Sequence, residues 1–297
     1  MRVIGLTGNI ATGKSLVATR LAALGADHTD ADRLAHQAME PGEPAWEGVR
    51  RRFGDSVLHS DGTVDRPALA RVVFADPVAL ADLESIVHPQ VLAQVDRLLE
   101  SSSADTIVIE AIKLIESGLL ARCQSLWVTT CRAELQLERL RRDRGLTTAD
   151  AVRRMNGQPD AAAKVARADV LLVNEGSRED LLAVVDKEWR CLTAGAAPQS
   201  TSTVTVSEQP GRVLIAAEGE HTAAATPLPG CDRRLDCASP ARLPRLLRPL
   251  IAAVESHERS PHLHVPRQTG YLQFMRGVGF QEVSDRVRES GYAVFRR

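Results

Sequence analysis

Hydrophobic and polar positions alternate on two length scales over about the first 190 residues of this 297-residue chain. Short runs of aliphatic and β-branched residues fit buried strands, and the longer stretches between them, with apolar positions every three or four residues, fit helices. The candidate strands are residues 3–6, 27–29, 106–109, 126–129 and 170–173, of which 27–29 is the weakest. This alternation predicts an α/β fold with a parallel sheet flanked by helices.

The pattern changes after residue 192. Residues 193–203 are small, polar and aperiodic, which predicts a flexible linker and a domain boundary. Beyond it, the pattern predicts strands at 204–206 and 213–216, a helix at 246–254, and a short helix followed by a terminal hairpin at 271–297. We therefore expect two domains, residues 1–192 and a smaller α+β domain of residues 204–297.

Two helices of the first domain carry N-terminal signals. Thr147 stands three residues before Asp150, and Ser177 stands three residues before Asp180. A hydroxyl followed by a carboxylate at this spacing caps a helix, because the two side chains accept backbone N–H groups that have no partner within the helix. We expect separate helices to start at these two positions.

Composition excludes several classes of protein. The 37 basic and 38 acidic residues leave a formal net charge of -1, so no overall field favours nucleic acid or a membrane surface. The five cysteines lack CxxC spacing, which argues against zinc or a disulfide framework. The sequence starts in a strand rather than a signal peptide, and it has no apolar run long enough to span a bilayer. We expect a cytoplasmic protein that binds neither nucleic acid nor membrane.

The first strand leads into a glycine-rich segment that opens a predicted helix at 15–24. Its sequence is Gly8-Asn9-Ile10-Ala11-Thr12-Gly13-Lys14-Ser15. Glycines let backbone N–H groups approach a phosphate chain, the helix N-terminus adds partial positive charge, Lys14 reaches the β- and γ-phosphates, and the Ser15 hydroxyl can ligate Mg²⁺. The alternative, a glycine-rich turn capped by a lysine, is disfavoured by the strand–helix context. We expect every residue of this P-loop to bind ATP.

Carboxylates follow two other strands, and in a parallel sheet such strand ends converge on one edge. Asp30 and Asp32 follow the strand at 27–29, where a carboxylate can accept the proton of an attacking hydroxyl. A cap on the next helix is the alternative role, so we assign the cap to Asp30 and the general base to Asp32. Glu110 ends the strand at 106–109 and is typical of a metal-orienting acid; an acid that faces water is the plainer alternative.

A row of long polar side chains predicts a lid. Gln136, Arg139 and Arg142 recur every three residues in a helical pattern at 134–144, so they share one face. Guanidinium groups in a row suit a lid over the triphosphate, which we place at 133–164. The alternative is a solvated face on which Glu138 pairs with Arg142.

The loop Asn174-Glu175-Gly176-Ser177 follows the last strand of the first domain. Its backbone could contact a purine ring, and we assign Asn174 and Gly176 to nucleotide binding. The signal is weak, because Asn-x-Gly is equally a common turn.

Together these motifs resemble the dephospho-coenzyme A kinases over about residues 1–190. The matching residues are Ile4-Gly5-Leu6-Thr7-Gly8, Lys14-Ser15, Asp30-Ala31-Asp32, Asp65-Arg66-x-x-Leu69, Val73-Phe74, Ile86-Val87-His88-Pro89-x-Val91, Glu116-Ser117-Gly118-Leu119, Gln136-x-x-Arg139-x-x-Arg142-Asp143, Gln158, Ala168-Asp169 and Asn174-x-Gly176-Ser177. So many matches in order are far more specific than the P-loop alone.

The resemblance implies a P-loop NTPase fold and a reaction. The γ-phosphoryl group of ATP would pass, with Mg²⁺, to the ribose 3′-hydroxyl of 3′-dephospho-coenzyme A, the last step of coenzyme A synthesis. The resemblance assigns Lys14 to phosphate stabilisation, Asp32 to the general base, and Arg139 and Arg142 to the lid.

The resemblance also implies an acceptor site. Residues 33–99 would form a helical substrate-binding region, in which His88 and Pro89 shape the acceptor pocket. Thr7 and Glu110 are expected to contact the acceptor as well. Taken alone, a histidine before proline is more typical of a structural residue before a turn.

Two features depart from the family. Where the family usually shows Asp before a Pro-Leu-Leu-like run, this chain has Glu110-Ala111-Ile112-Lys113-Leu114-Ile115. The acid is longer by one methylene, and Lys113 adds a charge to a normally apolar run, so the local metal and acceptor geometry is open.

The second departure is the tail after residue 203. Within it, Tyr271-Leu-Gln-Phe-Met-Arg-Gly-Val-Gly279-Phe280-Gln-Glu-Val283 is similar to the final helix and hairpin of an acyl-coenzyme A-dependent N-acetyltransferase. The tail lacks a Gln/Arg-x-x-Gly-x-Gly/Ala pyrophosphate loop. We therefore expect a non-catalytic appendage whose ligand or partner the sequence does not identify.

Two other functions compete with this one. A P-loop kinase for another small molecule, such as a nucleoside monophosphate, would share the donor site. A nucleotide-dependent switch is disfavoured, because the sequence has no Asn-Lys-x-Asp guanine motif and does have a candidate base and lid.

Overall fold

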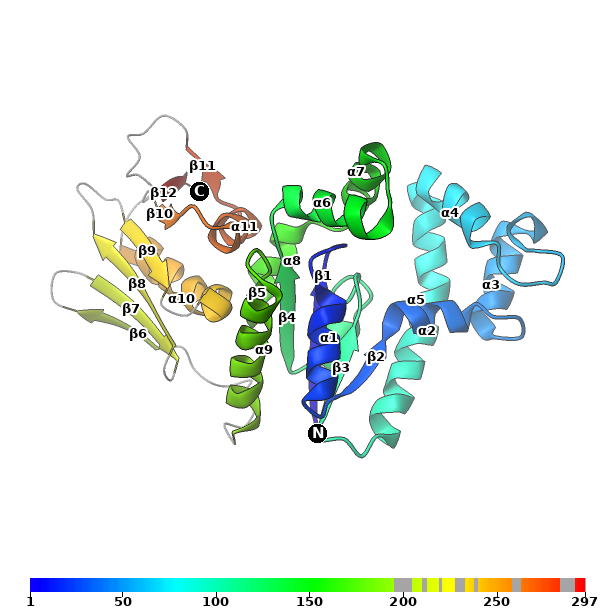
Figure 1. Cartoon of the computed structure of the whole chain (residues 1–297), viewed down its shortest axis with the longest axis horizontal. Coiled ribbons are helices and arrows are strands. Elements are labelled where there is room, and N and C mark those ends of the chain that lie inside the picture. Colours follow the sequence, from blue (N-terminus) through cyan, green and yellow to red (C-terminus); the bar gives the residue numbers. More distant parts are fainter. Residues whose placement is uncertain are drawn as a thin grey trace.

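The computed structural model describes residues 1–194, 205–209, 213–218, 221–227, 233–237, 240–257, 263–283 and 292–296. A parallel sheet occupies the centre of the molecule, a group of helices lies on one side of it, and a second sheet lies on the other side (Figure 1). The predicted linker at 193–203 falls outside the described residues from position 195 onward.

The central sheet has the strand order β2-β3-β1-β4-β5, and all its neighbours are parallel. Its strands are β1 (Arg2–Gly8), β2 (Asp27–Asp30), β3 (Thr106–Glu110), β4 (Ser125–Thr130) and β5 (Val170–Val173). Each predicted strand of the first domain is confirmed, and the weak one at 27–29 is an edge strand. Because the strands run the same way, their carboxyl ends all lie on one edge.

Helices cover both faces of this sheet. They are α1 (Lys14–Ala23), α5 (Pro77–Ser101), α8 (Ala161–Arg167) and α9 (Arg178–Thr193). Val17 of α1 and Leu181 of α9 join one buried cluster, and Val91 of α5 and Val165 of α8 join another. Burial on both faces explains why the strands appear in the sequence as short continuous apolar runs.

The predicted helix starts are confirmed. The Thr147 side chain accepts the backbone N–H of Asp150 at the start of α7 (Thr148–Asn156). Ser177 and Asp180 form a reciprocal capping box at the start of α9.

The remaining elements of the first part are mostly helical. They are α2 (Ala31–Ala38), α3 (Pro44–Phe53), η1 (Asp55–Val57), α4 (Arg66–Ala75), η2 (Leu119–Arg122) and α6 (Ala133–Arg144). Residues 33–99 are therefore largely helical, as predicted. Pro89 lies inside the long helix α5, so the alternative of a histidine before a turn is wrong at His88.

The second sheet has the order β11-β12-β10-β9-β8-β7-β6. Its strands are β6 (Thr205–Gln209), β7 (Val213–Glu218), β8 (His221–Pro227), β9 (Arg233–Cys237), β10 (Leu263–Pro266), β11 (Gln281–Glu282) and β12 (Tyr292–Arg296). Its helices are η3 (Pro240–Arg242), α10 (Leu243–His257) and α11 (Thr269–Gly277). β9 and β10 are parallel, and the other described neighbours are antiparallel.

This sheet confirms some predictions and adds strands that the pattern did not predict. The strands near 204–206 and 213–216, the helix around 246–254 and the helix followed by the pair β11 and β12 are present, although residue 204 lies outside the described residues. β8 consists largely of alanine and threonine and β9 begins with two arginines, so neither has a strong local strand preference. Pairing with neighbours on both sides makes them strands.

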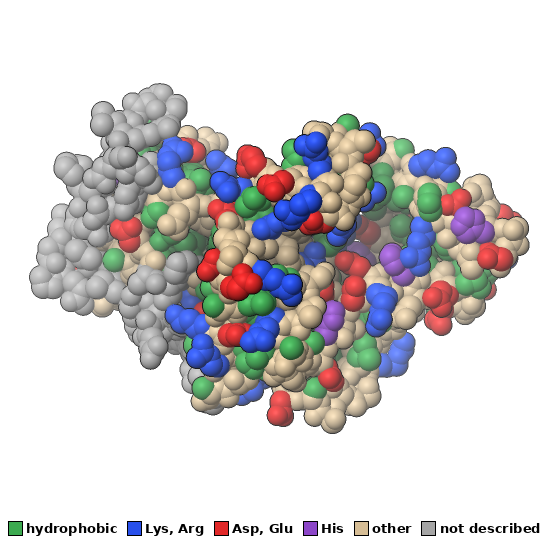
Figure 2. All heavy atoms as spheres, in the orientation of Figure 1, with side chains coloured by type: hydrophobic (Ala, Val, Ile, Leu, Met, Phe, Trp, Pro, Cys, Tyr) green, Lys and Arg blue, Asp and Glu red, His purple; other side chains and the backbone are tan. Residues whose placement is uncertain are grey.

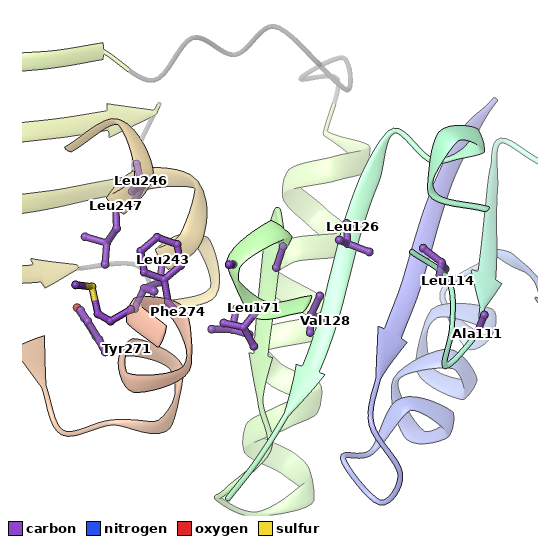
Figure 3. Close-up of a cluster of buried hydrophobic side chains, with 14 of the residues drawn as sticks. Ala111, Leu114, Leu126, Val128, Leu171, Leu243, Leu246, Leu247, Tyr271 and Phe274 are labelled. Atoms are coloured by element: carbon purple, nitrogen blue, oxygen red, sulfur yellow. The ribbon is translucent and has the colours of Figure 1, made fainter. Parts of the chain in front are cut away.

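One cluster of buried apolar side chains is shared by the two sheets. It runs from Leu114 and Val128 through Leu171 to Leu247 and Phe274 (Figure 3). The division into two domains at residue 192 therefore stays a prediction, because this cluster crosses the proposed boundary.

Close contacts join the two parts at α8. A Cβ added to Gly277 of α11 would lie 2.2 Å from the carbonyl oxygen of Ala162, so only a glycine allows this approach without a backbone shift. From α10, Arg248 Nε donates to the carbonyl oxygen of Ala166 at 2.6 Å. Helices α10 and α11 of the second part therefore pack directly against α8.

On the face of the molecule that Figure 2 shows, basic and acidic side chains of the described residues are intermixed and do not form a patch of one sign. No helix among the described residues is long and apolar enough to span a bilayer.

Candidate active site

Two glycines of the P-loop are required by the local geometry. Gly8 has φ +152, and a Cβ there would lie 2.2 Å from Thr129 Oγ1. Gly13 has φ +102, and a Cβ there would lie 2.4 Å from Asn174 Nδ2. Any other residue at these positions would strain the backbone and displace a neighbouring side chain.

Contacts with residues outside the P-loop fix its conformation. Thr12 Oγ1 and Thr129 Oγ1 are 2.7 Å apart, and the backbone N–H of Ile10 donates to Gln158 Oε1 at 2.6 Å. Asn9 Nδ2 donates to the carbonyl oxygen of Pro159 at 3.0 Å. These contacts restrict the conformations of the loop, and such a restriction reduces the entropy lost when a phosphate binds.

Lys14 lies at the N-terminus of α1 and among carboxylates. Burial lowers the pKa of its ammonium group, while the charges of Glu110 and Asp32 act in the opposite direction. Ser15 follows in the first turn of α1 and is exposed. The structure thus places the P-loop lysine next to the acids predicted at the strand ends.

Asp30 is the helix cap, as predicted, and Asp32 lies in the first turn of the same helix. Asp30 Oδ1 accepts the backbone N–H groups of Asp32 and Arg33, at 2.9 and 3.2 Å, and caps α2. Asp32 Oδ2 accepts the backbone N–H of Ile112 at 3.4 Å. Asp32 is open to solvent on one side, yet the protein around it raises the pKa of its carboxyl by desolvation, with a further increase from Asp30. A carboxyl with a raised pKa is a better proton acceptor.

Glu110 does not face water. Only 8% of its surface is exposed, and Oε2 lies 3.1 Å from His28 Nε2 on the neighbouring strand β2. The plainer alternative of a solvated strand-end acid is therefore wrong.

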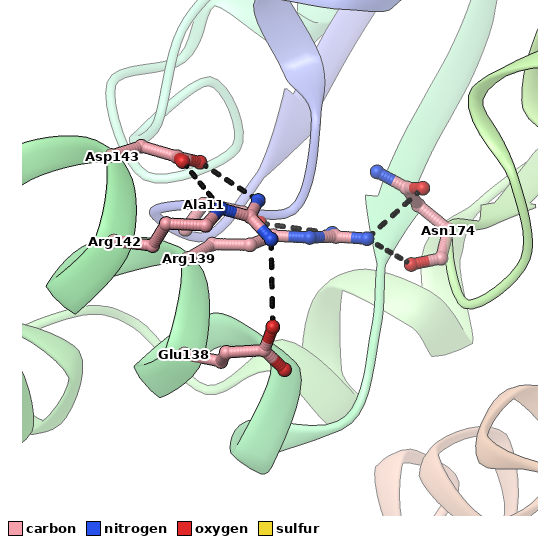
Figure 4. A network of polar contacts seen from close by, with 6 residues as sticks. All are labelled: Ala11, Glu138, Arg139, Arg142, Asp143 and Asn174. Atoms are coloured by element: carbon pink, nitrogen blue, oxygen red, sulfur yellow. Dashed lines mark hydrogen bonds and ion pairs between the residues drawn. The ribbon is translucent and has the colours of Figure 1, made fainter.

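Two arginines of α6 that were expected to share a site are separated. Arg139 donates to the carbonyl oxygen of Ala11 in the P-loop at 3.2 Å and to that of Asn174 at 3.0 Å (Figure 4). Arg142 is mostly exposed and pairs with Asp143 at 2.7 Å and Glu138 at 3.4 Å. Arg139 thus reaches the P-loop and the loop after β5, while Arg142 has the partner that the alternative predicted.

Asn174 points into the protein. It is 7% exposed, and its Nδ2 donates to the carbonyl oxygen of Thr12 at 2.9 Å. Its side chain therefore braces the P-loop, and the predicted purine contact would need the backbone of this loop, where Gly176 lies next to the capping box of α9.

Comparison with known proteins shows to which family a chain with these features belongs. The sequence model of the dephospho-CoA kinase family matches residues 2–180. The chain belongs to that family. Its activity is the last step of coenzyme A synthesis.

Named relatives agree with the family assignment. A dephospho-CoA kinase of Corynebacterium jeikeium is 42% identical over 192 residues, which cover 64% of this chain and 98% of the relative. One of Symbiobacterium thermophilum is 40% identical over 198 residues, covering 66% of this chain and 83% of the relative. The second sheet lies outside the family match.

Solved structures agree as well. The dephospho-CoA kinase of Campylobacter jejuni has a TM-score of 0.50 at 26% identity, covering 66% of this chain and 99% of that one. The protein TT1252 of Thermus thermophilus has a TM-score of 0.57 at 34% identity, covering 65% of this chain and 98% of that one.

The expected acceptor side of this kinase includes an ion pair that the family pattern does not predict. Lys113, the unusual charge after β3, pairs with Glu84 of α5. His88, one turn further along α5, is half-buried; burial lowers the pKa of its imidazole, opposed by Glu84 and reinforced by Lys113. Lys113 therefore ties the loop after β3 to the helix that carries His88 and Pro89.

Sequence reasoning missed one buried residue of this kinase site, Lys164. It is 1% exposed, and its Nζ donates to Asn9 Oδ1 at 3.0 Å and to the carbonyl oxygen of Ile112 at 2.7 Å. The available signal was a lone lysine in the apolar segment Ala161-Ala-Ala-Lys-Val-Ala166. Thr7, also fully buried, donates its hydroxyl to the same carbonyl at 3.1 Å, which makes its predicted acceptor contact indirect at best.

Proposed function

We propose that the chain transfers the γ-phosphoryl group of ATP to the ribose 3′-hydroxyl of 3′-dephospho-coenzyme A, with Asp32 as the general base. The observation that carries this proposal is the position of Asp32. Its carboxylate is held by the N–H of Ile112 and lies close enough to Lys14 and Glu110 for their charges to act on it. A base beside the phosphate lysine can take the proton of a hydroxyl as that hydroxyl attacks.

The P-loop supplies the donor half of the site. Backbone N–H groups of residues 8–15 and the N-terminus of α1 would bind the phosphates, and Lys14 would stabilise the charge that develops on the transferred group. Arg139, which already contacts the P-loop carbonyl of Ala11, would close the nucleotide side and exclude water. Arg142 has a smaller role or none in this proposal, because its partners are Glu138 and Asp143.

The acceptor would lie between the P-loop edge and the helices at 33–99. His88 and Pro89 on α5 and Glu110 at the end of β3 are the residues that we assign to it. The ion pair of Lys113 with Glu84 supports a formed pocket wall on this side.

Mg²⁺ would supply charge neutralisation on the β- and γ-phosphates. The exposed Ser15 hydroxyl, in the first turn of α1, is the protein oxygen that fits it. The donors offered there are oxygens, as Mg²⁺ prefers, and the ion takes its other ligands from phosphate and water.

One experiment separates this function from its nearest rival. The purified chain is incubated with ATP, Mg²⁺ and either 3′-dephospho-coenzyme A or a panel of nucleoside monophosphates, and ADP and phosphorylated product are quantified by mass spectrometry. We expect product only with 3′-dephospho-coenzyme A. Turnover with a nucleoside monophosphate alone would overturn the acceptor assignment, and ATP binding without any transfer would favour a switch protein.

We further propose that the second sheet is a non-catalytic module that resembles an acetyltransferase. The helix α11 followed by the antiparallel pair β11 and β12 supports this proposal, and so does the parallel pair β9 and β10 joined through α10. The test is thiol release from acetyl-coenzyme A in the presence of amine acceptors, for which we expect the rate of a protein-free control. Enzyme-dependent release would show that the module is catalytic.

A further inference from the structure

Lys164 is a charged side chain at a position where an apolar side chain would cost less free energy to bury. It lies on α8 with 1% of its surface exposed. Burying an ammonium group costs free energy that hydrogen bonds offset only in part, and an apolar residue of similar volume is often neutral or stabilising at such sites. A purely structural role therefore does not account for a lysine at this position.

The two acceptors of Lys164 belong to opposite halves of the site. Asn9, which accepts at 3.0 Å through Oδ1, is part of the P-loop on the donor side. Ile112, which accepts at 2.7 Å through its carbonyl oxygen, belongs to the loop after β3. The N–H of the same residue donates to Asp32 Oδ2 at 3.4 Å. One ammonium group thus connects the phosphate cradle to the residue that holds the proposed base.

We propose that Lys164 is a positioning residue that fixes the position of the P-loop relative to Asp32. The proposal rests on the general-base role proposed for Asp32. Phosphoryl transfer needs the attacking and leaving oxygens in line, and a misplacement of about 1 Å can cost about 10²-fold in rate. The residue that fixes the relative position of the two halves therefore acts on kcat without touching either substrate.

The charge of Lys164 strengthens this connection. Burial lowers the pKa of its ammonium group to about 8; Glu116 and Asp32 oppose the shift, and Lys14 and Lys113 reinforce it. Below that pH the group is charged and its two hydrogen bonds are charge-assisted, whereas the neutral amine donates more weakly. We expect kcat to fall as the pH rises through about 8, and we expect this alkaline limb to be absent in Lys164→Met.

The test compares two substitutions on the same helix, each of which replaces a basic residue by methionine. Lys164→Met removes both hydrogen bonds but keeps a long side chain, and Arg167→Met makes a matched change at an exposed position of α8. We expect Lys164→Met to lower kcat about 10²-fold with KM values for ATP and 3′-dephospho-coenzyme A within about threefold, and with Tm preserved. Arg167→Met is expected to keep the wild-type kcat.

Two outcomes overturn the proposal. One is a folded Lys164→Met protein with wild-type kcat; the other is a raised KM with unchanged kcat, which would make Lys164 a ligand-binding residue. If this variant does not fold, Lys164→Arg keeps the charge and the donors but moves the nitrogen atoms. We expect the kcat of Lys164→Arg to fall about tenfold by the same misplacement argument. A wild-type kcat in this variant contradicts the positioning role.

A double-mutant cycle separates this proposal from the proposed function. If Lys164 acts through Asp32, adding Lys164→Met to Asp32→Asn lowers kcat far less than the same change does in the wild type. Independent, multiplicative losses overturn the positioning role while leaving the base assignment intact. Wild-type turnover in Asp32→Asn alone defeats the base assignment instead.

Discussion

The two sheets of this protein differ in where their strands end. In the parallel sheet every strand ends on the same edge, so the P-loop, Asp32, Glu110 and Asn174 meet although they are far apart in the sequence. In the mixed sheet most described neighbours are antiparallel, so successive strand ends alternate between two edges. A parallel sheet therefore gathers polar residues into one site, and an antiparallel arrangement distributes them.

The two regions are nevertheless coupled through α8. Lys164 on this helix reaches the site, and Ala162, half a turn earlier, lies against Gly277 of the second region. We therefore expect the catalytic geometry of the first sheet to depend on packing contributed by the second. The following predictions test how far this dependence extends, beginning with the largest expected effect.

Asp32→Asn removes the proposed base from the parallel sheet, and we expect kcat to fall about 10²- to 10⁴-fold. Because the folded protein raises the pKa of this carboxyl, its ionised form destabilises the folded state relative to the unfolded state at pH values above that pKa. Neutralising it should therefore not lower Tm at pH 7, and any gain should vanish below the unfolded pKa, where both forms are neutral.

The control for this variant is Asp105→Asn, the same change at an exposed position just before β3, at the opposite edge of the sheet. It should keep full activity. Equal activity losses in the two variants would mean that position at the strand ends is not what makes Asp32 important. The measurements are steady-state kinetics and thermal unfolding.

Gly277→Val changes only the second region. A side chain there meets the backbone of Ala162, and overpacking of this kind costs about 1–3 kcal/mol. We expect a lower Tm and a lower kcat, because α8 shifts together with Lys164. Arg276→Ala, an exposed neighbour that pairs with Glu282 at 3.5 Å, is the control and should change little. A lower Tm with wild-type kcat would show that the two regions are energetically but not functionally coupled.

Arg139→Met and Arg142→Met compare two arginines of one helix. Arg139 donates to the P-loop and to Asn174, so its loss should raise the KM for ATP about tenfold, which corresponds to about 1.4 kcal/mol. Arg142 has exposed partners, so its loss should change the KM less than about twofold. Equal effects in the two variants would restore the row of lid arginines that the sequence pattern suggests.

Thr269→Val tests a single bond between the regions. Thr269 Oγ1 lies 2.5 Å from Glu175 Oε1, which also accepts the N–H of Arg132 at 2.9 Å. Loss of the hydroxyl should lower the free energy of unfolding by about 1 kcal/mol, with kcat unchanged. Thr193→Val, at the exposed end of α9, is the matched control and should be neutral. A large loss of kcat would mean that this bond positions the lid.

The sequence predicted the parallel sheet, and it singled out most of the residues that we propose for the site, because both leave local signals. Buried strands appear as short apolar runs, a P-loop needs glycines at fixed spacing, and helix caps pair hydroxyls with carboxylates three residues on. The helix cap at Asp30 was predictable for the same reason, because a cap is a local interaction. These predictions needed no knowledge of long-range contacts.

Other features were not predictable from local signals. The strands β8 and β9 exist through pairing rather than preference, and the contact of Arg139 with the carbonyl oxygen of Ala11 became clear only when the packing of α6 was known. Lys164 resembles any other lysine in a helical segment until its burial is known. Each depends on which distant segments become neighbours.

The amino-acid sequence by itself determined the P-loop, its strand and helix, and the kind of reaction that they support, since these follow from backbone conformation and residue spacing. The tertiary structure decided that Lys164 bridges Asn9 to Ile112, that Glu110 is buried beside His28, and that Gly277 packs on α8. The physical reason is that burial and hydrogen bonding between remote segments arise only when those segments pack together. In this protein both sheets contribute to one buried cluster.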